Sequence, residues 1–221
     1  LNRKWLISKV SNRRVLEAYE VLYRLGAIDE LNQATKLGHA MNKFPLRPEL
    51  SRALTAAMEA GADAETLRQL IAMTSSVEAG GLPYFEKDIG QAWRDDVRAE
   101  TDDDYAAQLD MFRATRQFYD GKDVDEVALE ARNYDLRNTR RAHRSYDKIC
   151  RVLHLATHTD LEVPDANKTD ELRRYLTTGL FDYAYQRHAP DDQSRKPTFL
   201  NVNDTDHSKR RDLSERGTYR G

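Results

Sequence analysis

The stretch "KFPLRPELSRAL", residues 43–54, ends one helical pattern and begins another within a few residues. Pro45 disfavours the helical conformation for the residue before it, so a helix that reaches Phe44 has to stop there. Pro48 suits the first turn of the next helix, where its missing N–H leaves no hydrogen bond unmade. The two prolines therefore predict a stiff elbow at residues 45–48 between two helical units.

The residues before the elbow predict a small winged unit. Ser11 can cap a helix whose apolar residues fall on one stripe, and Gly26 is suited to end it. The stripe consists of Val15, Leu16, Tyr19, Leu22 and Tyr23. Two short extended pieces, 27–29 and 33–35, follow with a polar turn between them. Thr35 can then cap a short helix that runs through Leu37 and Met41 to Phe44.

The residues after the elbow predict a helical bundle. Apolar residues recur at near-helical spacing from Leu46 to Met58, and Asp63 opens another helix that breaks at Gly80. Further helices are expected with Tyr105, Leu109, Phe112 and Tyr119, over residues 124–131, over 136–153 and over 172–178, the last ending before Gly179. We predict a winged-helix unit over 1–45, a bundle over 46–178 and a polar tail over 179–221, in which only 198–202 looks extended.

The composition agrees with a mainly α fold. Of the 221 residues 39% are hydrophobic and 33% charged, with only 6 prolines and 10 glycines, which favours helices with wide solvated faces. A formal net charge of -2 means that any nucleic-acid surface depends on local segregation of charge. The single cysteine, Cys150, cannot form an internal disulfide, which favours the cytoplasm. No apolar run approaches the roughly 18 residues of a membrane span.

The helix expected over 136–153 carries a row of cations on one face. At about 100° per residue the five side chains fall within a sector of roughly 80°, opposite an apolar face. We call this row the basic ridge: Arg137, Arg141, Arg144, Lys148 and Arg151. Guanidinium groups can bind a phosphate backbone without reading bases. The alternative is an ordinary solvated helix face, paired with acidic residues elsewhere.

Other candidate chemistry is weak. Residues 86–104 hold eight acids against three bases, which favours a solvated loop and helix start over a metal site. His154 and His158 have a spacing that could hold zinc, but surface positions are favoured. Cys150 lies on the apolar helix face and is expected to be a buried small hydrophobe. No phosphate-binding glycine loop occurs, so we expect no catalytic site and no cofactor in this chain.

Residues 15–54 resemble the helicase-associated region that follows the motor of DEAH-box RNA helicases. The shared elements are Leu25-Gly26-Ala27, then Thr35-Lys36-Leu37-Gly38, then Pro45-Leu46-Arg47-Pro48. Weaker similarity covers residues 103–112 and 133–153, although Asp103, Ala106 and Ala107 depart from the family pattern. The end of the chain resembles the approach to an oligonucleotide-binding (OB-fold) barrel and is most similar to the bacterial branch of the family.

The resemblance implies an accessory module, a winged helix followed by a ratchet-like bundle that closes over single-stranded RNA or DNA. ATP and Mg²⁺ would be bound by motor domains of the same polypeptide, with no membrane partner. The start at Leu1 and the early stop indicate a piece of a longer protein, with the barrel incomplete. Two alternatives remain: a helical protein–protein adaptor without a nucleic-acid role, and a DNA-binding winged helix, which Glu17 and Glu20 on its helix disfavour.

Overall fold

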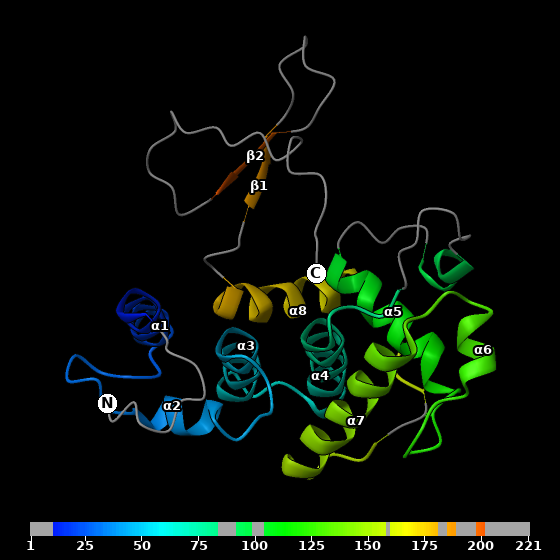
Figure 1. Cartoon of the computed structure of the whole chain (residues 1–221), viewed down its shortest axis with the longest axis horizontal. Helices are drawn as coiled ribbons and strands as arrows, with labels where there is room; N and C mark the ends of the chain where they lie inside the picture. The colour runs from blue at the N-terminus through cyan, green and yellow to red at the C-terminus, as the bar shows by residue number, and fades with distance from the viewer. Residues whose placement is uncertain are drawn as a thin grey trace.

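The computed structural model describes residues 11–83, 92–98, 104–157, 160–180, 185–188 and 198–201. Its helices are α1 (Asn12–Arg24), α2 (Lys36–Met41), α3 (Pro48–Glu59), α4 (Ala64–Ala79), the short 3₁₀ helix η2 (Ala92–Asp96), α5 (Asp104–Arg116), α6 (Glu126–Glu130), α7 (Leu136–Val152) and α8 (Ala166–Leu180). The strands β1 (Tyr185–His188) and β2 (Thr198–Asn201) pair antiparallel. The expected mainly α fold is confirmed (Figure 1).

The N-terminal helices and the wing form as the pattern predicts. The Ser11 and Thr35 side chains accept hydrogen bonds from the first turns of α1 and α2. The wing is one β-bridge between Ile28 and Ala34, closed by an Asp29 side chain that accepts from two backbone N–H groups of the turn. A small apolar cluster joins wing and helices through Leu25, Ala27 and Met41.

The elbow differs from the prediction in one detail. The helix before it ends at Met41, three residues earlier than expected, with Asn42 as its C-cap. Phe44 is instead buried in the main hydrophobic core, so it anchors the elbow to the bundle. Pro48 occupies the first turn of α3, as predicted.

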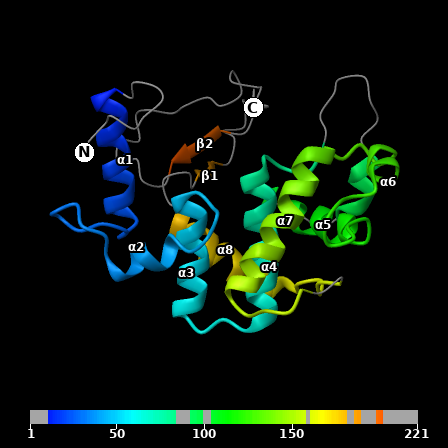
Figure 2. The ribbon, with the colours of Figure 1, turned by 60° about the horizontal axis from the view of Figure 1, so that its bottom comes forward.

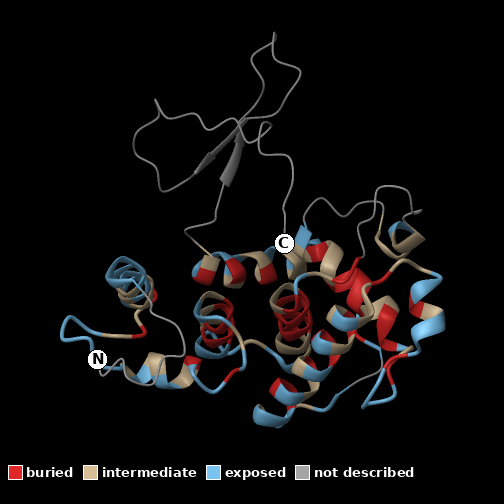
Figure 3. Cartoon of the chain, in the orientation of Figure 1, coloured by how far each residue is buried: buried red, intermediate tan, exposed pale blue. Residues whose placement is uncertain are grey.

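The bundle is built on two helix pairs. α4 packs most extensively on α7, and α3 on α8, while α5 packs on both α4 and α7 (Figures 1 and 2). Asp63 caps α4 by accepting from the N–H of Thr66 at 2.8 Å, and Gly80 ends it in the left-handed conformation. The core that these helices share is centred on fully buried side chains such as Leu54, Leu70 and Phe112 (Figure 3).

Two sequence expectations in the bundle are wrong in detail. The last helix does not stop before Gly179 but continues to Leu180. A glycine is required there because a Cβ would lie 1.9 Å from the carbonyl oxygen of Glu49 on α3. Tyr119 lies beyond the end of α5, in a β-bridge with Val124.

Parts of the predictions fall outside the described residues. Most of the acidic segment, His158 and most of the 179–221 tail belong there, as does the expected start of an OB-fold. Within the tail, β2 over 198–201 agrees with the expected extended piece, but that piece is not alone, because β1 over 185–188 pairs with it. The domain boundaries at residues 45 and 178 stay predictions. No described helix combines the length and the apolar character that crossing a bilayer requires.

Candidate nucleic-acid interface

The helix that carries the basic ridge is fixed by its cap and its buried face. Asp135 accepts from the N–H of Asn138 at 2.7 Å and begins α7. The face toward α4 is fully buried, as predicted from its apolar side chains. It includes Ala142, Tyr146, Ile149 and Cys150. The opposite face is exposed along much of the helix (Figure 3).

All five cations of the basic ridge are exposed. Within the described residues none of them forms an ion pair. Arg140, on the same helix but off the ridge, is paired with both Asp123 and Glu126. Arg144 donates from Nε to the carbonyl oxygen of Lys122 at 2.9 Å, which holds its guanidinium in place without neutralising it. The ridge therefore keeps its positive charge available.

In the described part of the acidic segment, Asp96 binds the connection between α6 and α7. Asp96 accepts from Nη1 of Arg132 and from the hydroxyl of Tyr134, both at 2.7 Å. Burial, and then the bond to Asp96, raises the pKa of Tyr134, so the phenol stays protonated and donates. The expectation of a merely solvated acid is thus wrong for Asp96. Among the described acids of this segment, none is paired with the ridge.

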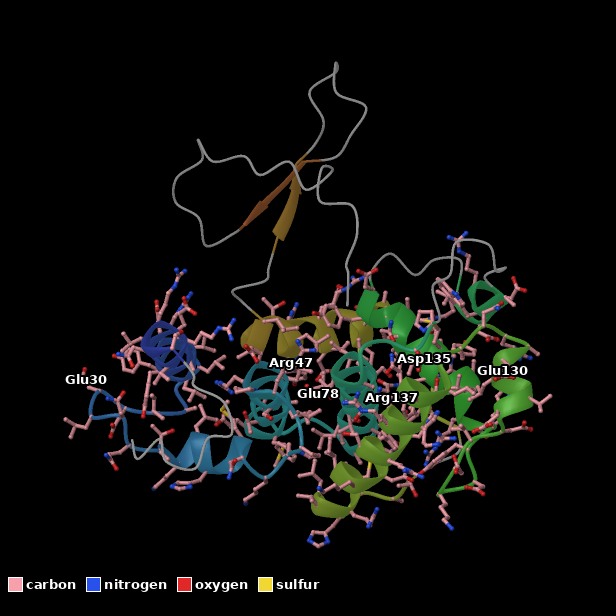
Figure 4. All side chains as sticks on the ribbon, in the orientation of Figure 1. Glu30, Arg47, Glu78, Glu130, Asp135 and Arg137 are labelled. Atoms are coloured by element: carbon pink, nitrogen blue, oxygen red, sulfur yellow. The ribbon has the colours of Figure 1, made fainter. Side chains whose placement is uncertain are left out.

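A groove beside the ridge brings together α4, α7 and the elbow. Its volume is about 290 Å³, and we call it the α4–α7 groove. It is lined by Pro45, Ser75, Glu78, Ala79, Arg141, Arg144, Ser145 and Lys148. Three of the five ridge cations therefore share one concave surface. Arg137 lies near the start of the same helix (Figure 4), and neither it nor Arg151 lines the groove.

Sequence reasoning missed the α4 side of this groove. Ser75 and Glu78 lie far before the ridge in the sequence, in a run that the sequence marks only as the end of a helix. No spacing rule relates residues on two different helices. A signal did exist in the two adjacent serines, Ser75 and Ser76, which are unusual among the apolar residues of a buried helix.

A second feature that the sequence did not predict holds α7 against α5. Arg116 of α5 donates to Asp147 at 2.7 Å and stacks over the rings of Tyr119 and Tyr146 at 5.0 and 5.1 Å. His143 lies beside them, with Nε2 at 3.0 Å from the Thr115 hydroxyl. Burial, and then the charge of Arg116, lowers the pKa of His143 to about 3. The imidazole is neutral, and the cluster ties α7 to α5.

The other candidate sites show no reactive arrangement. Burial raises the pKa of Cys150 to about 11, so its thiol is protonated and behaves as a core residue. His154 is exposed just after α7. No group of three or more His, Cys, Asp or Glu side chains that could hold a metal occurs in the described ranges.

Comparison with known proteins agrees with the resemblance seen in the motifs. Residues 18–46, which run from α1 to the elbow, match the winged-helix part of the helicase associated domain (HA2). The chain is also 28% identical over 179 residues to the probable ATP-dependent RNA helicase DHX35 homolog of Caenorhabditis elegans. The match covers 79% of this chain and 23% of that relative, so the chain spans less than a quarter of the relative's length.

These matches support the expected resemblance to RNA helicases but not its finer details. The relative comes from a nematode, so it gives no support to an origin in the bacterial branch. The winged-helix match covers one end of the chain, while the similarity to the helicase extends over most of it. Together they support the resemblance of this chain to the helicase-associated region of an RNA helicase.

Proposed function

We propose that the chain is the accessory module of an ATP-dependent RNA helicase of the DEAH-box type, and that its basic ridge holds single-stranded RNA by the phosphate backbone. Motor domains of the same polypeptide would bind ATP and Mg²⁺, in the cytoplasm. The observation that carries the proposal is the charge of the ridge: five exposed cations on one helix face without an ion pair among the described residues.

Unpaired cations at this spacing suit a phosphate chain. Some helix cations in this molecule are paired, as Arg13 is with Glu17 and Arg173 with Asp170. The ridge instead places five cations without an ion pair among the described residues on one helix face. Backbone contacts without base readout suit a protein that moves along RNA of any sequence. The stiff elbow would transmit movement of the motor to the bundle instead of absorbing it.

The test is binding of labelled oligouridine and its deoxy counterpart to the whole chain across a salt series. For single strands the logarithm of affinity falls with the logarithm of salt by about 0.7 for each phosphate contact. Charge reversal at both ends of the ridge, Arg137→Glu with Arg151→Glu, is expected to lower both the affinity and that slope. The matched control reverses the exposed pair Arg13 and Arg14 on α1, with the same change in net charge.

The outcome separates RNA binding by the basic ridge, which we call the clamp, from a general effect of charge. Loss of slope in the ridge variant alone supports the proposal. Equal losses in both variants, or a salt-independent affinity, would remove the ridge from the RNA path. An equal affinity for the deoxy strand leaves the clamp intact and shows that 2′-hydroxyls are not read.

A second candidate function is a protein–protein adaptor, favoured by exposed apolar side chains on the winged unit. Leu16 and Tyr23 of α1 are 68% and 51% exposed, and Leu31 at the tip of the wing is 78% exposed. This candidate predicts that Leu16→Ser with Leu31→Ser releases a protein partner in a pull-down and leaves RNA binding unchanged. The ridge variant should then have no effect on that partner.

A further inference from the structure

The α4–α7 groove contains two serine hydroxyls that have no hydrogen-bond partner. Ser75 is fully buried, and neither its Oγ nor the Oγ of Ser145 has a partner in the structure. Serines in helices ordinarily satisfy their hydroxyl on a carbonyl one turn back, as Ser76 does on Ala72 at 2.9 Å. Leaving a buried hydroxyl unpaired is costly to the fold, so two in one groove are available to donate to a ligand.

The charge around these hydroxyls favours an anion. Arg141, Arg144 and Lys148 line the same groove, and Glu78 is the one acid among its lining residues. The Oε2 atom of Glu78 already accepts from the N–H and Nε of Arg47, at 3.0 and 3.2 Å. The carboxylate is therefore paired from outside the groove, and the three cations are not.

The end of α4 that borders the groove is also neutralised. Free carbonyl groups at a helix C-terminus repel anions. Here the carbonyl of Val77 accepts from Nη2 of Arg47 at 3.3 Å, and the N–H groups of Gly80 and Gly81 bond to the carbonyls of Val77 and Ser76. Arg47 thus offsets both negative features that face the groove.

We propose that the α4–α7 groove binds one phosphodiester group of a single-stranded nucleic acid, with Ser75 and Ser145 donating hydrogen bonds and Arg141, Arg144 and Lys148 supplying the charge. This site rests on the proposed clamp and locates its tightest contact. A serine hydroxyl hydrogen rotates freely, so it can turn to an incoming phosphate oxygen. Arg47 acts as a positioning residue that keeps Glu78 from competing.

The experiment uses the salt dependence of binding, which distinguishes contacts made by hydroxyls from contacts made by cations. A Ser75→Ala/Ser145→Ala variant of the whole chain is expected to bind labelled oligouridine about tenfold more weakly, because hydrogen bonds to charged groups are lost. Its salt slope should equal that of the wild type, since hydroxyls displace no counterions. Its melting temperature should be equal or higher, because the variant no longer buries two unpaired hydroxyls. A purely structural role for the serines predicts no change in binding.

Three comparisons complete the test. The Arg141→Glu/Arg144→Glu variant should lose both affinity and slope. An oligouridine with an uncharged methylphosphonate backbone should bind wild type and serine variant equally, which identifies phosphate as the group recognised. If the serine variant binds the charged strand as tightly as wild type while the Arg137/Arg151 variant is weakened, the groove site is wrong and the clamp stands. If no variant changes binding, both proposals fail.

Discussion

Arg47 and Glu78 are joined across 31 positions of sequence, and their contact fixes the elbow to the bundle. The backbone N–H and Nε of Arg47 both donate to one carboxylate oxygen of Glu78. The two side chains lie next to each other between α3 and α4 (Figure 4). Because Arg47 immediately precedes α3 and Glu78 lies in the last turn of α4, the contact sets the path of the chain between the winged unit and the bundle.

Replacing Arg47 by alanine should destabilise the elbow modestly. Both side chains are partly exposed, at 48% and 30%, so solvent screens the pair and the loss in unfolding free energy should stay within about 1 kcal/mol. Urea denaturation measures it, with Arg13→Ala as the control, since that pair is 88% and 55% exposed. A double-mutant cycle with Glu78→Ala should show coupling; a coupling energy of zero would mean that the contact does not hold the elbow.

Replacing Gly179 by alanine should be far more damaging than its place in an ordinary helix suggests. The new Cβ would lie 1.9 Å from the Glu49 carbonyl oxygen and 3.1 Å from the Ala53 backbone nitrogen, so α8 would have to move away from α3. Overpacking of this kind costs about 3 kcal/mol. Thermal unfolding compares the variant with Thr178→Ala, whose side chain is exposed. Similar melting temperatures for the two would contradict the close approach of these helices.

Replacing Arg98 by alanine should destabilise the fold, because the buried carboxylate of Asp110 loses the Arg98 side chain as a donor. Asp110 is 1% exposed at its side chain and accepts from Nε and the backbone N–H of Arg98, at 2.9 and 3.2 Å. Arg98→Ala removes the charged donor, and the expected loss is about 1.5–3 kcal/mol. Arg173→Ala, which affects an exposed pair with Asp170, is the control and should cost much less. Chemical denaturation distinguishes the two.

Acid should weaken the fold through His143. Its folded pKa of about 3 lies below the ordinary value of 6.5, so the unfolded chain takes up a proton first as pH falls. The stabilisation is present in full above pH 6.5 and is lost as pH falls toward 3, by about 1.4 kcal/mol for each unit.

The measurement is the unfolding free energy between pH 6.5 and 4.5 for wild type and His143→Gln. The glutamine variant does not titrate at this position and should show the shallower dependence on pH. His39→Gln serves as the control because His39 is exposed. A wild-type slope in His143→Gln would show that the imidazole is not held neutral.

The sequence by itself determined most of the helices, because caps and breakers act locally. Ser11, Thr35 and Asp63 begin helices because their side chains accept hydrogen bonds from the first turn. Pro48 suits the first turn of α3 because its missing N–H leaves no hydrogen bond unmade. The ridge was also predictable, since its five positions follow from helical spacing alone. Local rules failed where a residue packs against other elements. Phe44 was expected in the helix, but it lies beyond the end of α2 and is buried in the main core.

Only the tertiary structure decided which ridge cations share a groove and what lies opposite them. Ser75 and Glu78 line one groove with Arg141 and Lys148 because α4 packs on α7, and no periodicity within one helix encodes that juxtaposition. The same holds for Gly179, whose missing side chain matters because the Glu49 carbonyl approaches it. Local hydrogen bonds and helical periodicity are properties of adjacent residues, whereas a binding groove depends on contacts between distant ones, which form only when the core packs.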